Sequence, residues 1–148
     1  MLSSVMQDYD KIPVLIVDDD HLDVMAIERA LQQVALKNPI SRVSNGVEAL
    51  AYLRKKVSTL KKLNAIILLD INMPQMNGHE FLEEVGKDPD LHNLIIFIIT
   101  TSDDPRDKLA IFDDQVAGYI LKTSSIGGYE NIANQLQKYI RTVGLLGD

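Results

Sequence analysis

The sequence predicts an α/β fold, in which five strand–helix units form one parallel sheet covered by helices on both faces. Five short runs rich in Ile, Leu and Val recur at intervals of about 25 residues, and a segment with helical spacing follows each run. Three of the runs are continuously apolar, as strands buried on both faces of a sheet must be. Strands that alternate with helices in this way favour a parallel sheet between two helical layers.

The expected strands and helices follow one another in a regular order. The strands are expected at Val14–Val17, Ile40–Val43, Ile66–Leu69, Ile95–Ile99 and Tyr119–Leu121. Helical spacing of apolar residues between the strands gives each helix one buried face. In chain order, these faces are Ile27, Leu31 and Val34; Leu50 and Leu53; Phe81 and Val85; Leu109 and Phe112; and Tyr129, Ala133, Leu136, Ile140 and Val143.

The starts of three helices are marked by residues that can accept hydrogen bonds from free backbone amides. Asp20 precedes the first helix, and Asn45 precedes the second with Glu48 three residues later. Asp104 is followed by Pro105 before the fourth helix. Asp and Asn are favoured N-cap residues, and proline is tolerated in the first helical turn.

Length and composition predict a single domain over residues 1–148. The chain is 46% hydrophobic, and it has 21 acidic against 15 basic residues, a formal net charge of −6. A chain of this length can bury about 68–70% of its unfolded surface, so it needs no disulfide or structural metal to fold. We expect a core over about residues 13–143, and no effector domain.

Several function classes are excluded or disfavoured by the same composition. The chain has no cysteine, which excludes thiolate zinc sites and cysteine nucleophiles. Its acidic balance argues against nucleic acid as a partner. The longest apolar runs are far shorter than the roughly 18 residues needed to span a membrane. Asp8 and Asp10 interrupt any signal-like start. We therefore expect a cytoplasmic protein with no membrane partner.

Polar residues with related chemistry follow four of the five expected strands. Asp18 and Asp19 follow the first strand, Asp70 the third, Thr100 the fourth and Lys122 the fifth. In an open parallel α/β sheet, ligands bind outside the carboxyl ends of the strands. The sequence therefore predicts a functional site at this edge of the sheet.

The residue types at this edge suit phosphoryl transfer to a carboxylate. Two carboxylates about 5 Å apart repel by roughly 3 kcal/mol at an effective dielectric constant near 20, so the acids need a cation. Mg²⁺ prefers one or two carboxylates, waters and a phosphate oxygen. Lys122 and Thr100 offer a positive charge and a hydroxyl donor for phosphoryl oxygens. Asp70, after the central apolar run, is the natural nucleophile.

Each of these residues also has a purely structural interpretation. The first aspartates could cap a helix, Lys122 could extend along the surface to reach water, and Thr100 could satisfy the end of a strand. The combination is more specific than its parts, because residues from four separate strand ends must agree.

With these motifs in place, the chain resembles the receiver domain of two-component response regulators from about Pro13 to Val143. Five motifs appear in the order typical of that family: Val17-Asp18-Asp19, Leu69-Asp70-Ile71-Asn72-Met73-Pro74, Asn77-Gly78, Ile99-Thr100-Thr101-Ser102 and Gly118-Tyr119-Ile120-Leu121-Lys122. The resemblance implies a (βα)5 flavodoxin-like three-layer sandwich with strand order 2-1-3-4-5.

The resemblance also implies how the site works. Asp70 would accept a phosphoryl group from a sensor histidine kinase in a Mg²⁺-dependent reaction. Such a domain is not a conventional enzyme, because it catalyses only its own phosphorylation and dephosphorylation. Asp18, Asp19 and Asp70, with the backbone carbonyl of Asn72, would hold the metal.

Two further roles follow from the same resemblance. Thr100 and Lys122 would bind the phosphoryl group. Tyr119 would change rotamer as Thr100 is drawn toward that group, so the two residues would form a switch.

Partners are implied in the same way. Output would pass to a downstream protein target or a histidine phosphotransfer protein, and a homodimer could form through the fourth helix, fifth strand and fifth helix. Leu145 and Leu146, expected beyond the last helix, could extend that contact. The segments Lys55–Lys62, Lys87–Pro89 and Thr100–Ser102 resemble small stand-alone regulators that include phytochrome-associated ones. A phytochrome-type kinase is therefore a candidate partner.

Thr123 departs from the family pattern, which usually has a cis proline after the lysine. A cis peptide bond before any other residue costs about 2.5–4 kcal/mol. We therefore expect a trans bond between Lys122 and Thr123, with the connection to the last helix rerouted.

Two other readings stay open at the level of the sequence. The runs Asp18-Asp19-Asp20 and Ile98-Ile99-Thr100 could fit a phosphohydrolase of the haloacid-dehalogenase type, but such an enzyme needs an acidic pair after Lys122, where only Glu130 and Asp148 occur. A flavodoxin-like module or degenerate receiver would act as a binding module without phosphorylation. Three aspartates after the first strand would repel a flavin phosphate, and a degenerate receiver would lack the acceptor or the metal acids.

Overall fold

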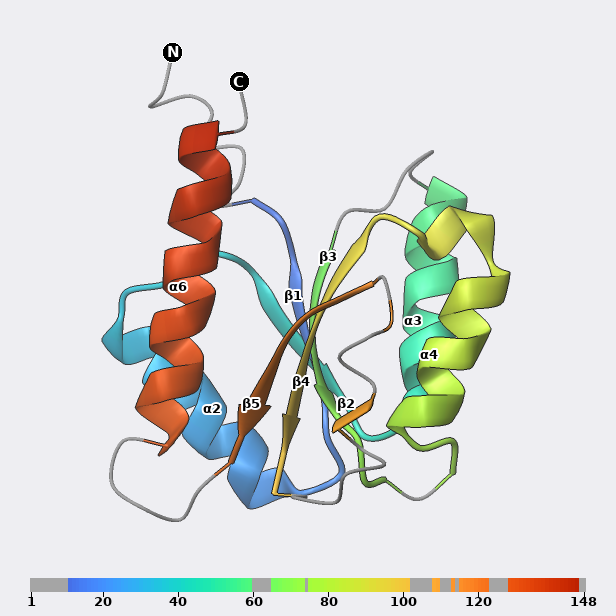
Figure 1. Cartoon of the computed structure of the whole chain (residues 1–148), viewed down its shortest axis with the longest axis horizontal. Helices are drawn as coiled ribbons and strands as arrows, with labels where there is room; N and C mark the ends of the chain where they lie inside the picture. Colours follow the sequence, from blue (N-terminus) through green and yellow to red (C-terminus); the bar gives the residue numbers. More distant parts are fainter. Residues whose placement is uncertain are drawn as a thin grey trace.

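The protein is a three-layer α/β sandwich with a five-stranded parallel sheet in its middle (Figure 1). This computed structural model describes residues 11–59, 65–73, 75–101, 108–109, 113, 115–122 and 128–146. The strand order is β2-β1-β3-β4-β5, and every neighbouring pair is parallel. The fold and strand order expected from the sequence are both confirmed.

All five strands lie where the apolar runs predict them. They are β1 (Val14–Val17), β2 (Ile40–Val43), β3 (Ala65–Asp70), β4 (Leu94–Thr100) and β5 (Val116–Leu121). The largest difference is at β5, which begins at Val116 rather than Tyr119. Ala117 and Gly118 have little strand propensity of their own, but Gly118 pairs with Phe97 of β4, and this pairing keeps the segment extended.

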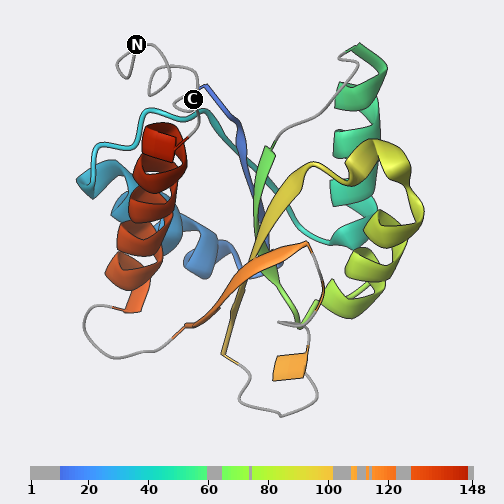
Figure 2. The ribbon, with the colours of Figure 1, turned by 45° about the horizontal axis from the view of Figure 1, so that its top comes forward.

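The described helices cover both faces of the sheet (Figures 1 and 2). The described α-helices are α2 (His21–Gln33), α3 (Gly46–Thr59), α4 (Gly78–Lys87) and α6 (Gly128–Leu146), with a 3₁₀ helix η1 (Pro89–Leu91) before β4. Helices α2 and α6 lie on one face and α3 and α4 on the other. No helix in these ranges is both long and apolar enough to cross a membrane.

The sheet separates two hydrophobic cores. Leu15 and Val17 of β1 point into the core under α3 and α4, whereas Val14 and Ile16 point into the core under α2 and α6. Side chains alternate between the two faces of a strand, so a strand buried on both faces must be apolar at every position. All four residues of β1 are buried, as the continuous apolar run predicts.

The predicted N-caps of the first two helices are present. The Asp20 side chain accepts hydrogen bonds from the backbone N–H groups of Leu22 and Asp23 at the start of α2. Asn45 accepts from the Glu48 N–H at 2.9 Å before α3. These bonds satisfy amides that have no partner inside the helix.

Two expectations about helices need correction or lie outside the described part. The predicted fourth helix falls mostly on residues that the structure does not describe, including Asp104, Pro105 and Phe112. Leu109, expected on its buried face, is 62% exposed. The expectation that Leu145 and Leu146 lie beyond the last helix is wrong, because α6 continues to Leu146. Leu146 follows Val143, the last residue of the expected apolar face, by three residues, so the helical spacing extends to the end of α6.

The loop that follows β3 is held in a tight shape by contacts with its neighbours. Gln75 and Met76 both have left-handed backbone angles, with φ values of 48° and 60°. Such angles are uncommon for residues other than glycine. The Met76 carbonyl accepts a hydrogen bond from the Gly46 N–H at 3.3 Å, and the Gly78 N–H donates to the Ile71 carbonyl at 3.0 Å. A Cβ atom on Gly78 would lie 2.7 Å from the Ile71 Cα, so this close approach requires glycine.

Candidate functional site

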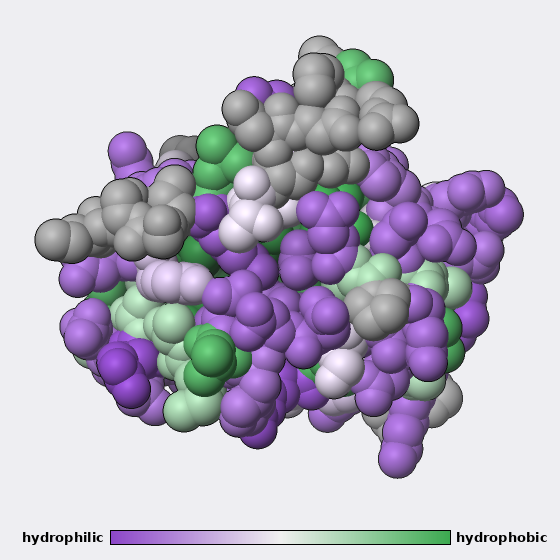
Figure 3. All heavy atoms as spheres, turned by 90° about the horizontal axis from the view of Figure 1, so that it is seen from below, coloured by the Kyte–Doolittle hydropathy of each residue, from purple (hydrophilic) through white to green (hydrophobic). Residues whose placement is uncertain are grey.

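Three aspartates from two adjacent strands meet at the carboxyl edge of the sheet. Asp18 and Asp19 directly follow β1, and Asp70 is the last residue of the neighbouring strand β3. Each offers a carboxylate oxygen, and these oxygens lie within 4.8 Å of one another. The described part of the surface at this end of the molecule is mostly hydrophilic (Figure 3).

The three carboxylates differ in exposure. Asp18 and Asp70 are buried, with 3% and 7% of their surface exposed, and Asp19 is exposed. The Asp18 carboxylate accepts a hydrogen bond from the Asp20 N–H at 2.9 Å, and the Asp70 carboxylate accepts from the Asn72 N–H at 3.2 Å. These bonds fix the two buried carboxylates, while Asp19 stays open to solvent.

Lys122 brings a positive charge into the cluster from the end of β5. Its backbone N–H donates to the Thr100 carbonyl at 2.7 Å, which continues the pairing of β5 with β4 beyond Leu121. Its ammonium Nζ lies 2.5 Å from Asp18 Oδ2 and 3.5 Å from Asp70 Oδ2. Only 6% of the residue is exposed, so Lys122 is a buried ion-pair partner rather than a surface lysine.

Two residues of the cluster were not expected from the sequence. Asp23, in the first turn of α2, accepts a hydrogen bond from Lys122 Nζ at 3.0 Å. Its other carboxylate oxygen accepts from the hydroxyl of Tyr129, in the first turn of α6. Sequence spacing gave no signal for these contacts, because Asp19 and Asp20 precede α2 and Asp23 meets Lys122 and Tyr129 only through the packing of the fold.

The charges of the cluster change its ionisation. Burial, together with the nearby charge of Asp18, raises the pKa of Asp70 to about 7, although Lys122 opposes the shift. Burial likewise raises the pKa of Asp18 despite its bond with Lys122. Burial alone would lower the pKa of Lys122, but its bonds with Asp18 and Asp23 and the charge of Asp70 raise it. Lys122 is therefore charged at neutral pH, and the cluster has too little positive charge for its carboxylates.

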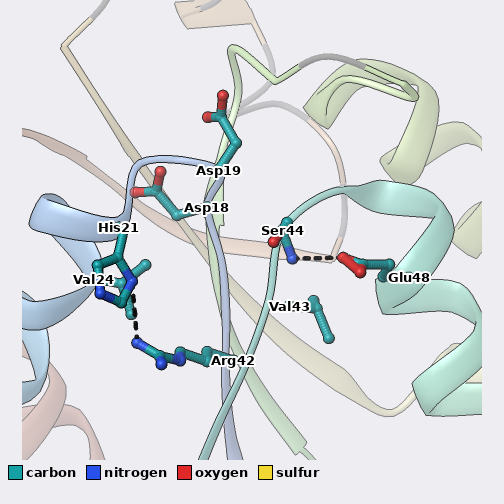
Figure 4. A pocket seen from close by; sticks show the side chains of 8 residues that line it. All are labelled: Asp18, Asp19, His21, Val24, Arg42, Val43, Ser44 and Glu48. Carbon is teal, nitrogen blue, oxygen red and sulfur yellow. Dashed lines mark hydrogen bonds between the residues drawn. The ribbon is translucent and has the colours of Figure 1, made fainter.

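A polar hollow of about 260 Å³ borders the aspartates on the side of β2 (Figure 4). His21 and Arg42 lie within hydrogen-bond distance there, at 3.4 Å, and Glu48 accepts from the Ser44 N–H. The hollow is lined by residues that follow β1 and by residues in or next to α2, β2 and α3: Asp18, Asp19, His21, Val24, Arg42, Val43, Ser44 and Glu48. It offers an open, polar approach beside the carboxylates.

The remaining residues expected at the site lie nearby in the fold. Thr100 is fully buried at the end of β4. Tyr119 of β5 is half-buried and packs against the core under α3 and α4. Asn72 is exposed and follows β3. Thr123 is outside the described residues, so the trans bond after Lys122 stays a prediction.

Comparison with known proteins gives one family. A model of the response regulator receiver domain matches residues 14–133. The two-component response regulator ORR13 of Oryza sativa subsp. japonica is 31% identical over 123 residues, which cover 83% of this chain and 96% of that protein.

Solved structures with the same fold include two regulators of phytochrome signalling. The phosphorylated cyanobacterial phytochrome response regulator RcpA has a TM-score of 0.75 and 27% identity, covering 87% of this chain and 93% of that one. The bacteriophytochrome response regulator RtBRR has a TM-score of 0.69 and 26% identity, covering 91% of this chain and 78% of that one.

Proposed function

Because the chain belongs to the response regulator receiver domain family, we propose that it receives a phosphoryl group on Asp70 from a histidine kinase, in a Mg²⁺-dependent reaction, and signals through its phosphorylated surface. The observation that carries this proposal is the position of Asp70: a buried carboxylate at the central strand end, 3.5 Å from the Lys122 ammonium and beside two further carboxylates.

The transfer itself is a substitution at phosphorus. A carboxylate oxygen of Asp70 attacks the phosphorus of a phosphohistidine, an O–P bond forms, the N–P bond breaks, and the leaving imidazole nitrogen takes up a proton from solvent. Lys122 pairs with one oxygen of the transferred group, and Thr100 donates its hydroxyl to another. The product is an acyl phosphate on Asp70, with Tyr119 as the residue that responds to the movement of Thr100.

The donor set fits a hard divalent cation. Three carboxylates with oxygens within 4.8 Å of one another suit Mg²⁺, which favours oxygen ligands. Asp18, Asp19, Asp70 and the carbonyl of Asn72 would hold it. Bound there, Mg²⁺ would offset the repulsion between the acids and the incoming phosphoryl group.

A direct test is to incubate the protein with a small-molecule phosphodonor and measure its intact mass with and without Mg²⁺. We expect the mass of one phosphoryl group to be added only in the presence of the cation. A degenerate receiver, which would act as a phosphorylation-independent binding module, would gain no mass in either sample. A haloacid-dehalogenase-type hydrolase would release inorganic phosphate and would depend on an aspartate of the run Asp18–Asp20 rather than on Asp70.

Asp19→Asn is expected to weaken Mg²⁺ binding while the fold is kept. Asp19 is exposed, so removing its charge costs little stability, but it removes one of three anionic oxygen ligands. A Mg²⁺ titration followed by NMR or calorimetry measures the change, which we expect to be about tenfold or more in Kd. Asp20→Asn is the matched control, because asparagine preserves the N-cap. An unchanged titration for Asp19→Asn would place the metal elsewhere.

Binding of Mg²⁺ is expected to stabilise the protein more at pH 8 than at pH 5. The pKa of Asp70 is raised to about 7, so between about pH 4 and pH 7 the folded state keeps a proton that the unfolded chain has lost. Without metal, the raised pKa of Asp70 therefore lowers the free energy of unfolding as pH rises from about 4 to about 7. The metal requires the carboxylate form and removes the penalty.

Thermal denaturation at the two pH values, with Mg²⁺ or with a chelator, measures this effect. The comparison uses the Asp70→Asn variant as control, because its metal-free stability should depend less on pH in this range. An equal shift in Tm at pH 5 and pH 8 would contradict the ionisation behaviour that we assign to Asp70.

The partners follow from the family at a coarser level. Receiver domains work with histidine kinases and downstream proteins, and the likeness to RcpA and RtBRR supports a phytochrome-type kinase for this chain. We propose output by protein contact or by relay to a histidine phosphotransfer protein. The homodimer through the fourth helix, β5 and α6, the single-domain organisation and the cytoplasmic location stay predictions.

A further inference from the structure

The Asp23 carboxylate joins the two ends of the connection between β5 and α6. Lys122 stands at the end of β5, and Tyr129 stands in the first turn of α6. One Asp23 oxygen accepts from the Lys122 ammonium at 3.0 Å, and the other accepts from the Tyr129 hydroxyl. Asp23 itself comes from α2, which packs beside α6. Asp23 therefore joins α2 to two consecutive elements that come 99 and 106 residues later in the chain, as measured at Lys122 and Tyr129.

We propose that Asp23, held by Tyr129, is a positioning residue that fixes the Lys122 ammonium for the phosphoryl group and links its position to the start of α6. The inference rests on the proposed function, because Lys122 is the group that would bind the phosphoryl oxygen. Asp23 acts through Lys122, and Tyr129 acts through Asp23.

The geometry of the ammonium supports this role. An ammonium has three N–H donors. Two of them are directed to Asp18 at 2.5 Å and to Asp23 at 3.0 Å. Nζ then lies 3.5 Å from Asp70, on the side where the phosphoryl group would form. With Asp23 in place, the ammonium is anchored by two carboxylates rather than one.

The Tyr129 hydroxyl gives Asp23 a defined orientation. Asp23 retains 20% side-chain exposure, so without a second partner its carboxylate could rotate toward water. The hydroxyl is a donor that occupies the oxygen not used by Lys122. Since Tyr129 belongs to the first turn of α6, movement of Lys122 toward a phosphoryl group would be transmitted to that helix through Asp23.

The direction in which the phosphorylation rate changes distinguishes a positioning role of Asp23 from a simple effect of its negative charge. Removing a negative charge near the site should assist an anionic phosphodonor. Removing the anchor of Lys122 should hinder it. Asp23→Asn removes the charge and weakens the anchor, because Lys122 and Tyr129 donate to different oxygens of Asp23 and asparagine keeps an acceptor oxygen at only one of these two positions. Asp20→Asn removes a nearby charge alone, since Asp20 bonds only to the backbone in the contacts described for it.

The experiment measures the rate of Mg²⁺-dependent phosphorylation by acetyl phosphate in Asp23→Asn, Tyr129→Phe and the double variant. We expect Asp23→Asn to slow the reaction roughly tenfold, equivalent to about 1.4 kcal/mol, and Tyr129→Phe to slow it less. The double variant should be no slower than Asp23→Asn, because the two residues act in series. Asp20→Asn and Tyr52→Phe, which removes a hydroxyl on α3, are the controls and should match the wild-type rate or exceed it.

A second measurement does not depend on phosphorylation. The ¹⁵N-correlated NMR signal of the Lys122 ammonium should be visible in the unphosphorylated wild type, where hydrogen bonds slow its exchange with water. It should be lost or broadened in Asp23→Asn and retained in Asp20→Asn. A change of fold alone would not move this signal while leaving the melting temperature and the remaining spectrum intact.

The two measurements distinguish failure of the inference from failure of the proposed function. If the wild type takes up no phosphoryl group, the proposed function fails, and the ammonium signal still tests the anchor. If the wild type is phosphorylated but Asp23→Asn reacts at the wild-type rate with its Lys122 signal intact, the positioning role is wrong. Fully additive losses in the double variant would overturn the series arrangement of Asp23 and Tyr129.

Discussion

Asp70→Asn is expected to lower phosphoryl incorporation by roughly three orders of magnitude or more, as removal of a nucleophile does in other covalent mechanisms. An amide oxygen does not form a stable bond to phosphorus, and no other carboxylate in the described cluster combines burial with the central position after β3. The measurement is intact-mass spectrometry after treatment with a small-molecule phosphodonor and Mg²⁺. Incorporation at the wild-type rate in Asp70→Asn would show that another residue is the acceptor.

The loss of phosphorylation in Asp70→Asn reports the missing nucleophile only if the variant stays folded. Asparagine can still accept the hydrogen bond from the Asn72 N–H. The substitution also removes the buried carboxyl group of Asp70, whose pKa is raised to about 7. At pH 8 without metal, Asp70→Asn should therefore be at least as stable as the wild type in urea denaturation. Asp90→Asn, an exposed aspartate in η1, is the matched control and should leave both phosphorylation and stability unchanged.

Lys122→Met is expected to destabilise the metal-free protein by about 3–5 kcal/mol at pH 8, because it leaves buried carboxylates without their cation. Methionine keeps most of the side-chain volume, so the loss reports charge rather than a cavity. Lys122 and Asp18 expose 3% and 0% of their side chains, which makes solvent screening weak. Urea denaturation measures the loss, and Mg²⁺ or a lower pH should restore part of it.

An exposed lysine provides the comparison. Lys87 lies 3.5 Å from Glu83 and 3.7 Å from Glu84, but 64% of its side chain is exposed. Surface ion pairs contribute about 0–1 kcal/mol, so Lys87→Met should change stability very little. Equal small effects for Lys122→Met and Lys87→Met would mean that the buried network contributes no net stabilisation.

Most of the fold could be predicted because the three inner strands, β1, β3 and β4, are buried on both faces. A four-residue run such as Val14–Val17 has no polar position, and this pattern fits only a covered strand. The prediction was weakest at β5, where Ala117 and Gly118 carry little apolar signal and strand pairing decides the conformation. The predicted fourth helix falls largely outside the described residues, and Leu109 is exposed rather than buried.

The candidate site could be predicted where strand ends determine it. The positions of Asp18, Asp70 and Lys122 follow from the rule that parallel strands end at one edge. Asp23 and Tyr129 could not be predicted in this way, because their meeting depends on how α2 and α6 pack over the sheet. Helical spacing places a residue on a face, but it does not say which side chain of another helix lies opposite.

The separation of the ion-pair partners along the chain sets the order in which the site can be assembled. Lys122 and Asp18 are 104 residues apart, and Tyr129 and Asp23 are 106 apart. During synthesis, β1 and β3 emerge long before β5, so a partly made sheet brings carboxylates together with no lysine to balance them. Contacts between distant residues slow folding, because closing a long loop costs entropy. The charge balance of the carboxylate cluster is therefore completed only when β5 docks against β4, and its last contact also needs α6 in place beside α2.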